Sequence, residues 1–299
     1  MRVVIALGGN ALLRRDEAPS AETQSRNVVA AARAIAAIAE RHDVVVTHGN
    51  GPQVGLLALQ SANQDSAASW PLDVLSAESE GMIGYVIERD LGPRLPERRL
   101  ATLLTLVEVD PADPALKRPA KPIGPVYGEA EARRLAAARG WTVAPDGANW
   151  RRVVGSPRPL RILEIGTIRH LIADHFIVIC AGGGGIPVAE GPNGMLYGVE
   201  AVIDKDRTSA LLARDIGADA LLLLTDVEGI FRDFGTPGAA LLPQVSVADI
   251  GALGLDPGSM GPKAEAAVEF AVSGGFSAIG RMEGALDLLE RRTGTSIIV

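Results

Sequence analysis

Lysine is rare in this chain, and two of its lysines lie in loops whose composition suits an anion. The 299 residues include four lysines and twenty-five arginines. Lys205 lies between two aspartates, and Lys263 follows a segment rich in Gly, Ser and Pro. A compact ammonium is hard to replace where it must act as a point charge on a transferring phosphoryl oxygen. Lys205 and Lys263 therefore predict a phosphoryl-transfer site. The alternative is a composition bias that left a few lysines by chance, and we prefer it for Lys117.

The tripeptide Asp204-Lys205-Asp206 carries the densest charge. A buried lysine needs a carboxylate partner to stay charged. We therefore expect Asp206 to hold both Lys205 and Lys263 toward one phosphate. The alternative is a surface charge cluster that opens a helix over Asp206–Ile216, with Asp206 as its N-cap. Both roles are compatible with one side chain.

Apolar runs of strand length lead into polar, mostly glycine-rich loops. The loops are Gly8-Gly9-Asn10, residues 48–53, the four glycines at 182–185, and Asp226-Val227-Glu228-Gly229; the runs before them are Val3–Leu7, Val44–Thr47, Phe176–Cys180 and Ala220–Leu224. Runs that are apolar on both faces suit buried parallel strands. Ligands bind beyond the carboxyl ends of such strands. The glycine-rich loops are therefore expected to converge on one site, where free N–H groups hold an anion.

Helical patterns alternate with these strands. They cover Thr23–Arg41, Gln53–Asn63, Ser76–Asp90, Leu160–Asp174 and Pro262–Ser273. The alternation predicts an α/β fold: a three-layer αβα sandwich around a mainly parallel open sheet.

Two segments depart from the alternation. Residues 109–159 hold eight of the nineteen prolines and a charged helix over Glu129–Arg139. They predict an insertion or small subdomain between a strand over Leu100–Val107 and the helix after Pro159. Residues 190–204 predict a hairpin that turns at Pro192-Asn193-Gly194.

Bulk properties exclude several classes of protein. A net charge of −7 argues against a nucleic-acid binder, and no apolar stretch is long enough to span a membrane. Cys180, the only cysteine, ends an apolar run and is interpreted as a core thiol in a cytoplasmic protein. His48 suits either a general base or a hydrogen-bonded structural residue, and we favour the second. No metal-ligand spacing, P-loop or dinucleotide motif is present, so no protein metal site is expected.

Several of these segments together resemble the carbamate kinases of the amino acid kinase superfamily. The resemblance is in family order across almost the whole chain and thins after Ser273. The matching segments are residues 6–12, 48–55, 110–113, 182–188, 198–206 and 257–263, together with Lys121-Pro122-Ile123-Gly124-Pro125. Acetylglutamate kinases and their relatives typically carry a lysine at the position of Ala6. Carbamate kinases lack that lysine, and so does this chain.

The resemblance implies reversible phosphoryl transfer between ATP and carbamate, giving ADP and carbamoyl phosphate. In this family the reaction usually runs toward ATP formation, during the catabolism of arginine or other nitrogen compounds. The resemblance further implies Mg²⁺ held mainly by nucleotide phosphates, and a homodimer. Residues 1–210 would form the carbamate-binding lobe, with a small protruding subdomain at about 110–159 as a lid, and residues 211–299 would form the nucleotide-binding lobe.

The resemblance also implies roles for individual residues. Lys205 and Lys263 would neutralise the transferring phosphoryl group, and Asp206 would orient both. Substrate and phosphate contacts would come from Gly8, Gly9, Asn10, Asn50, Gly51, Lys121, Gly183, Gly184 and Gly185. The nucleotide would contact Asp226, Val227, Gly229 and Met260.

Two other functions remain open from the sequence. One is an amino acid kinase that forms a different acyl phosphate from another small carboxylate. The other is a nucleotide or metabolite sensor without catalysis. Ala6 and the Lys-Pro-Ile-Gly-Pro insert argue against the first, and intact Lys205, Asp206 and Lys263 argue against the second.

Overall fold

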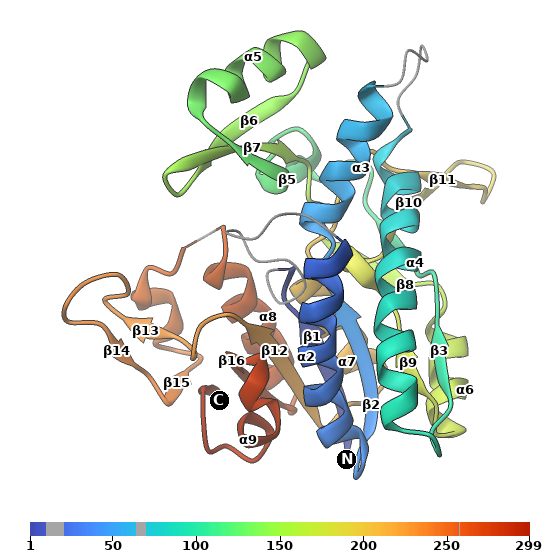
Figure 1. The fold of residues 1–299 in the computed structure, drawn as a ribbon, viewed down its shortest axis with the longest axis vertical. Coiled ribbons are helices and arrows are strands. Elements are labelled where there is room, and N and C mark those ends of the chain that lie inside the picture. The colour runs from blue at the N-terminus through green and yellow to red at the C-terminus, as the bar shows by residue number, and fades with distance from the viewer. Residues whose placement is uncertain (10–20, 64–69, 257) are drawn as a thin grey trace.

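The computed structural model describes residues 1–9, 21–63, 70–256 and 258–299 (Figure 1). Across these residues, an eight-stranded sheet forms the centre of the molecule. Its spatial order is β15 (Gln244–Ser246), β17 (Thr295–Ile298), β16 (Phe276–Arg281), β12 (Ala220–Thr225), β1 (Arg2–Leu7), β2 (Asp43–His48), β9 (Ile177–Ile179) and β3 (Leu100–Thr102). All neighbours pair in parallel except β16 and β17. The predicted mainly parallel open sheet is confirmed.

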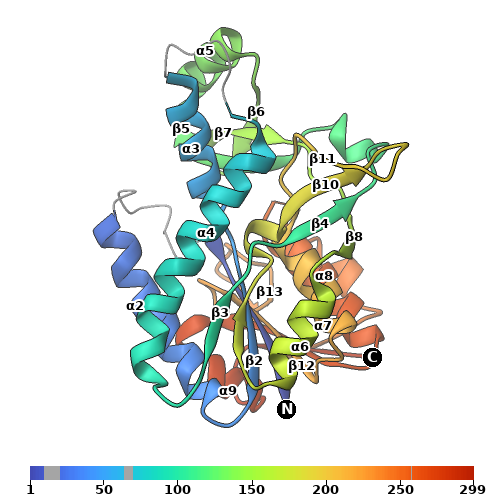
Figure 2. The same ribbon diagram turned by 90° about the vertical axis from the view of Figure 1, so that its right-hand side faces the viewer.

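Helices cover both faces of this sheet (Figures 1 and 2). One face packs against α2 (Ala21–Ala39), α4 (Leu72–Leu91) and α9 (Ala285–Leu289). The other packs against α6 (Ile165–Ala173), α7 (Lys205–Asp215) and α8 (Met260–Val272). The three-layer αβα arrangement is therefore confirmed.

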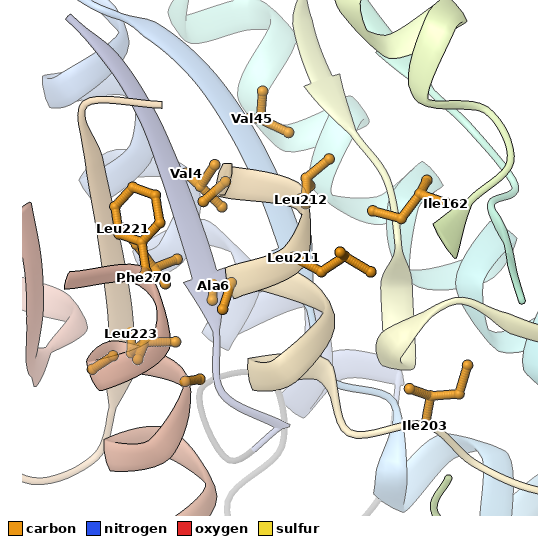
Figure 3. Packing of buried hydrophobic residues seen from close by; sticks show 14 of the residues in the cluster. Val4, Ala6, Val45, Ile162, Ile203, Leu211, Leu212, Leu221, Leu223 and Phe270 are labelled. Carbon is orange, nitrogen blue, oxygen red and sulfur yellow. The ribbon is translucent and has the colours of Figure 1, made fainter. Parts of the chain in front are cut away.

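Strand β1 shows how the sequence produces two cores. Val3, Ile5 and Leu7 pack on the α2 side, whereas Val4 and Ala6 pack on the α7 side. Successive side chains of a strand point to opposite faces, so a strand between two helical layers must be apolar throughout. Figure 3 shows the second core, where Val4 and Ala6 lie beside Leu211 and Leu212 of α7. This packing holds the start of α7 beside the carboxyl end of β1.

The predicted strand over Leu100–Val107 is wrong as one element. Its first part is β3, and its second part is β4 (Leu106–Val109), which joins a separate sheet of order β11-β10-β4-β8. The chain leaves the large sheet between them because side chains capture the backbone donors there. Thr105 N donates to Glu80 at 3.2 Å and Leu106 N donates to Glu164 at 2.8 Å.

The start of the predicted helix over Leu160–Asp174 is also wrong. Pro159–Ile162 form strand β8, antiparallel to β4, and the helix α6 begins at Ile165. In the strand, the Arg161 guanidinium reaches Glu108 across the pair at 2.7 Å. This cross-strand ion pair fits an extended chain better than a helix.

The predicted hairpin is present, with different limits. Strand β10 (Ile186–Glu190) pairs with β11 (Leu196–Gly198), and Gly194 in the turn has φ +71°. Residues 199–204 leave the hairpin as an irregular connection to α7, with a tight turn in which Ala201 N donates to the carbonyl of Val199 at 2.8 Å.

The remaining helix predictions hold with small shifts at the ends. Helix α3 covers Gly51–Asn63, α4 begins four residues before the predicted Ser76, and Pro262 lies in the first turn of α8. Among the described helices, none has the length and apolar character needed to cross a bilayer.

The proline-rich segment forms a small unit that projects from the main body (Figure 1). It contains a three-stranded sheet and one helix, with a short turn of helix η2 (Pro114–Leu116) before them. The elements are β5 (Lys121–Tyr127), α5 (Glu129–Arg139), β6 (Thr142–Asp146) and β7 (Asn149–Val154). We call these residues, 121–154, the protruding unit. Beyond the large sheet, a second small ribbon of β13 (Phe231–Arg232) and β14 (Ala240–Leu241) lies near the C-terminal end of β12.

The protruding unit rests on α3 through two glycines. A Cβ at Gly55 would lie 2.1 Å from the backbone of Gly124, which itself has φ +74°. Only residues without side chains allow this approach. The contact places the start of β5, and hence Lys121, over the carboxyl ends of the central strands.

Candidate active site

The N-terminus of α7 carries the charged tripeptide. Asp204, not Asp206, is the N-cap: its carboxylate accepts from Asp206 N at 2.9 Å and from Arg207 N at 3.2 Å. The predicted cap at Asp206 is wrong because that carboxylate is turned to the lysines. Capping by Asp204 satisfies free amides at the helix start, and its negative charge suits the positive end of the helix dipole.

Asp206 joins the two lysines, as predicted. One of its oxygens accepts from Lys205 Nζ, and the other accepts from Lys263 Nζ at 3.0 Å. Lys263 comes from α8, which packs against α7. Two ammonium groups that are 58 residues apart in sequence are thus held on one buried carboxylate.

Lys121 joins this cluster from the protruding unit. Its ammonium forms an ion pair with Asp204, the carboxylate that caps α7. Lys121 is the most exposed of the three lysines, with 28% of its side chain accessible against 8% for Lys205. The protruding unit therefore contributes a positive charge to the site.

Burial and neighbouring charges shift the pKa values of these groups in opposite directions. Burial lowers the pKa of Lys205 to about 8, although Asp206 opposes the shift. For Lys263, burial alone would lower the pKa, but Asp206 and Asp204 outweigh it and raise the pKa. Burial likewise opposes ionisation of Asp206, yet the adjacent lysines hold its pKa below the usual range. Asp206 is therefore an anion, and Lys205 is the group closest to losing its proton.

A cavity of about 140 Å³ lies in front of this cluster. Its walls combine the glycine-rich loops with the lysines, and its lining includes Gly8, Gly9, Gly49, Asn50, Gly51, Lys121, Gly183, Asp204, Lys205, Asp206 and Lys263. The loops after β1, β2 and β9 thus converge as predicted.

Glycine is required where these loops touch. A Cβ at Gly49 would lie 2.7 Å from Gly9 N. Gly183 has φ +67°, and a Cβ there would meet the Asn50 amide at 2.1 Å. The absence of side chains lets the loops after β2 and β9 pack in contact and present backbone to a ligand.

Gly184 and Gly185, which were also predicted to contact the phosphate, pack against other parts of the chain and do not line the cavity. A Cβ at Gly184 would meet the carbonyl of Ile203, and one at Gly185 would meet Val107 and Thr105. Neither belongs to the cavity lining, so within the four-glycine run it is Gly183 that faces the cavity. Gly184 and Gly185 instead allow the loop to pack on β4 and the connection before α7. Asn10 lies outside the described residues.

A second cavity, of about 460 Å³, adjoins the first. Its lining includes all four residues predicted for the nucleotide, Asp226, Val227, Gly229 and Met260. The two cavities share a boundary formed by Thr225, Ser259 and Lys263. Lys263 therefore stands where a group held in one cavity would meet a group held in the other.

The structure adds residues that sequence reasoning missed. Arg151 of β7 lines the first cavity and donates to the carbonyl of Gly124 at 2.8 Å. With twenty-five arginines in the chain, nothing in its local sequence singled it out. Thr225 and Ser259 could have been found from their places directly beside predicted site loops.

His48 has the structural role that we favoured. Its side chain is fully buried, its Nδ1 lies 3.2 Å from the carbonyl of Gly49, and it is not part of the cavity lining. Burial lowers its pKa to about 4, so the imidazole is neutral. The side chain packs against Gly182, where a Cβ would lie 2.3 Å from the ring.

Comparison with known proteins places these features in a family. The model of the amino acid kinase family matches residues 1–279. Carbamate kinases from Rhizobium meliloti and Haemophilus influenzae are each 52% identical to this chain over 99% of its length, and the matches cover 93% and 96% of those proteins. The solved carbamate kinase from Giardia lamblia bound to AMP-PNP has a TM-score of 0.88 and 41% identity, covering 99% of this chain and 98% of that one.

Proposed function

This chain belongs to the amino acid kinase family, and we propose that its site transfers a phosphoryl group reversibly between ATP and carbamate. The observation that carries the proposal is the carboxylate of Asp206, which holds Lys205 and Lys263 at the junction of two cavities. The carbamate kinases similar over nearly the full length support the same choice of acceptor. No feature of the described residues favours a different acceptor carboxylate or a sensor without catalysis.

For this reaction the protein must mainly position the two substrates and supply positive charge. The carbamate oxygen is already anionic, so no general base is needed. Catalysis then consists of holding two anions in line and neutralising the charge on the transferring phosphoryl group. Lys205 and Lys263 supply two positive charges from one side, and Lys121 supplies another from the protruding unit.

The two cavities suggest how the substrates divide. We assign carbamate and the transferring phosphate to the smaller cavity, where Gly8, Gly9, Asn50, Gly51 and Gly183 give small surfaces and amides. The nucleotide then occupies the larger one. This supports a carbamate lobe in residues 1–210, with its lid, and a nucleotide lobe in residues 211–299, although the large sheet is continuous across both.

Magnesium fits this site chiefly as a companion of the phosphates. Asp204 and Asp206, the carboxylates nearest the reacting groups, are engaged by lysines. Across the described residues, no group of three or more His, Cys, Asp or Glu side chains is arranged to hold a metal. Mg²⁺ binds well through phosphate oxygens and water with few protein ligands. When bound with the nucleotide, it would reduce the negative charge on the phosphates.

We further propose that two copies associate into a homodimer in the cytoplasm. Met82 and Tyr85 are exposed one turn apart on α4, and the exposed Leu104 lies against Gly81 of the same helix. Exposed apolar side chains that gather on one face are typical of an interface, and two-fold dimers are the commonest assembly. Light scattering on the purified chain and on a Tyr85→Glu variant tests this. A monomeric parent protein would contradict it.

The test of function is ATP formation from ADP and carbamoyl phosphate with Mg²⁺. We expect turnover by the parent chain and a loss well beyond tenfold in Lys205→Ala. A variant that keeps its activity to within about tenfold, a barrier change of only ~1.4 kcal/mol, would rule out the role given to Lys205. Absence of turnover in the parent chain, with ADP still bound, would overturn the choice of carbamate.

A further inference from the structure

Helix α4 carries buried polar side chains beside the site without lining its cavity. Most of its buried face is apolar, but Ser76, Ser79 and Glu80 are each at most 2% exposed. Burying such groups costs free energy unless they are hydrogen-bonded. Their partners therefore show what the polar segment of α4 holds in place.

Ser79 is bonded to Asn50, which lines the cavity. Asn50 Nδ2 donates to Ser79 Oγ at 2.8 Å, and Ser79 Oγ donates to the carbonyl of Ser76 at 2.9 Å. Because the single hydroxyl proton goes to that carbonyl, the hydroxyl can only accept from Asn50. The amide is thus fixed with its nitrogen toward α4. Its second N–H and its carbonyl oxygen remain for other partners.

Glu80 is bonded to the glycine run. One carboxyl oxygen accepts from Gly182 N at 2.8 Å, and the other accepts from Thr105 N at 3.2 Å. Gly182 is the first residue of η3 (Gly182–Gly184), and η3 packs against α4. Burial raises the pKa of Glu80 to about 8. A carboxyl group at such a position needs these two donors to offset its burial.

The two contacts converge because Asn50 and Gly183 touch. A Cβ at Gly183 would overlap the Asn50 amide. Ser79 thus fixes one side of this contact, and Glu80 fixes the residue before the other side. Adjacent residues of one helix control the loops after β2 and β9.

We propose that Ser79 and Glu80 are positioning residues that set Asn50 and Gly183 for the phosphoryl group. The inference rests on the proposed function for the identity of that group. Neither residue belongs to the cavity lining, so neither acts on substrate directly.

The first test is a double-mutant cycle on Ser79→Ala and Asn50→Ala, with steady-state ATP formation as the readout. We expect Ser79→Ala to lower kcat by about tenfold or more, since small misplacements of a reacting group have such effects. The matched control is Ser76→Ala, which removes a buried hydroxyl one turn away and keeps the carbonyl that Ser79 uses. Its kcat should stay within about twofold. ADP affinity should be unchanged in both variants, because the larger cavity has no residue from α4.

The cycle separates positioning from general destabilisation. If Ser79 acts through Asn50, its substitution should have little further effect in the Asn50→Ala background. An equal loss in both backgrounds, or a Ser79→Ala variant with the parent kcat, would overturn the proposal. Glu80→Gln adds a second variant of the same size: its amide can accept from only one of the two N–H groups. It should also lower kcat by tenfold or more without changing ADP affinity, and parent-like kcat would contradict the role of Glu80.

A second readout does not depend on activity. The chain has six asparagines, so [¹⁵N]Asn labelling gives few side-chain NH₂ signals, and Asn50→Ala assigns the one of interest. Ser79→Ala should shift or broaden that signal, whereas Ser76→Ala should leave it in place. An unmoved signal in Ser79→Ala refutes the positioning contact. Failure of the parent chain to make ATP refutes the proposed function alone.

Discussion

Replacing Asp206 with asparagine tests the centre of the site most directly. The substitution keeps the size of the side chain but removes the charge that both Lys205 and Lys263 contact. Hydrogen bonds to charged groups contribute about 1.5–3 kcal/mol each. Removing one partner of a buried ion pair costs about 3–5 kcal/mol, because the other charge stays buried without compensation. We take about 3–5 kcal/mol as the expected loss.

If that loss falls on the transition state, kcat/KM should decrease by about a hundredfold to several thousandfold. The pH dependence should change as well. Burial already lowers the pKa of Lys205 to about 8, and Asp206 is the main group that opposes this shift. Without the carboxylate, the pKa of Lys205 should fall further. The variant should therefore lose activity at a lower pH than the parent chain and recover part of it on acidification.

The assay is coupled ATP formation from ADP and carbamoyl phosphate, measured across pH at saturating Mg²⁺. Asp287→Asn is the matched control, because it makes the same change in an exposed ion pair with Arg292. Exposed pairs contribute about 0–1 kcal/mol, so the control should keep parent kinetics. An Asp206→Asn variant within tenfold of the parent, with the same pH limb, would show that Asp206 does not sustain the two charges.

Three further expectations concern other parts of the molecule. In the parent chain, kcat/KM should fall as pH rises through about 8, because the folded-state pKa of Lys205 is lowered and deprotonation removes the needed charge; a flat profile through pH 8–10 would contradict this assignment. Gly55→Ala should raise KM for carbamoyl phosphate by about tenfold or more, because the new Cβ would overlap Gly124 and move Lys121. Gly128→Ala is the control: a Cβ there meets open space, so KM should stay at the parent value. Cys180 should resist a thiol reagent until the chain unfolds, because it is buried and burial raises its pKa; labelling of the native protein at the rate of a free thiol would refute this.

The elements around the site could be predicted because their sequences admit few alternatives. Runs such as Ala220–Leu224 are apolar at every position and of strand length, as a strand covered on both faces requires, and a polar loop follows each of them. The pairing of Asp206 with Lys205 and Lys263 was equally predictable, because a buried lysine needs a carboxylate partner. These inferences depend on local composition, which the sequence displays.

The errors arose where distant side chains decide the local structure. The break between β3 and β4 depends on Glu80 and Glu164, which capture backbone donors from 25 and 58 residues away. The contribution of Arg151 depends on how the protruding unit lies on α3. The same holds for the polar segment of α4, whose residues read as an ordinary helix surface until their partners are known. No local pattern marks such contacts.

The charges of the smaller cavity explain how an acidic protein attracts anionic substrates. The chain has a net charge of −7, yet the cavity lining includes Lys121, Lys205, Lys263 and Arg151 against only Asp204 and Asp206. The two carboxylates allow the lysines to stay charged while buried, but leave an excess of two formal positive charges among the lining residues, of which the one on Arg151 is also paired with Asp146 at 3.4 Å. A phosphate group, with a charge of about −1.5 to −2, compensates that excess.

Asp204 also caps α7 while it pairs with Lys121, so this ion pair couples the position of the protruding unit to the helix that carries Lys205. An anion in the cavity can take over part of the contact between Lys121 and Asp204 without leaving the cap unsatisfied, because the cap uses the other carboxylate oxygen. Movement of the protruding unit can therefore break its ion pair with Asp204 and still leave the cap of α7 intact.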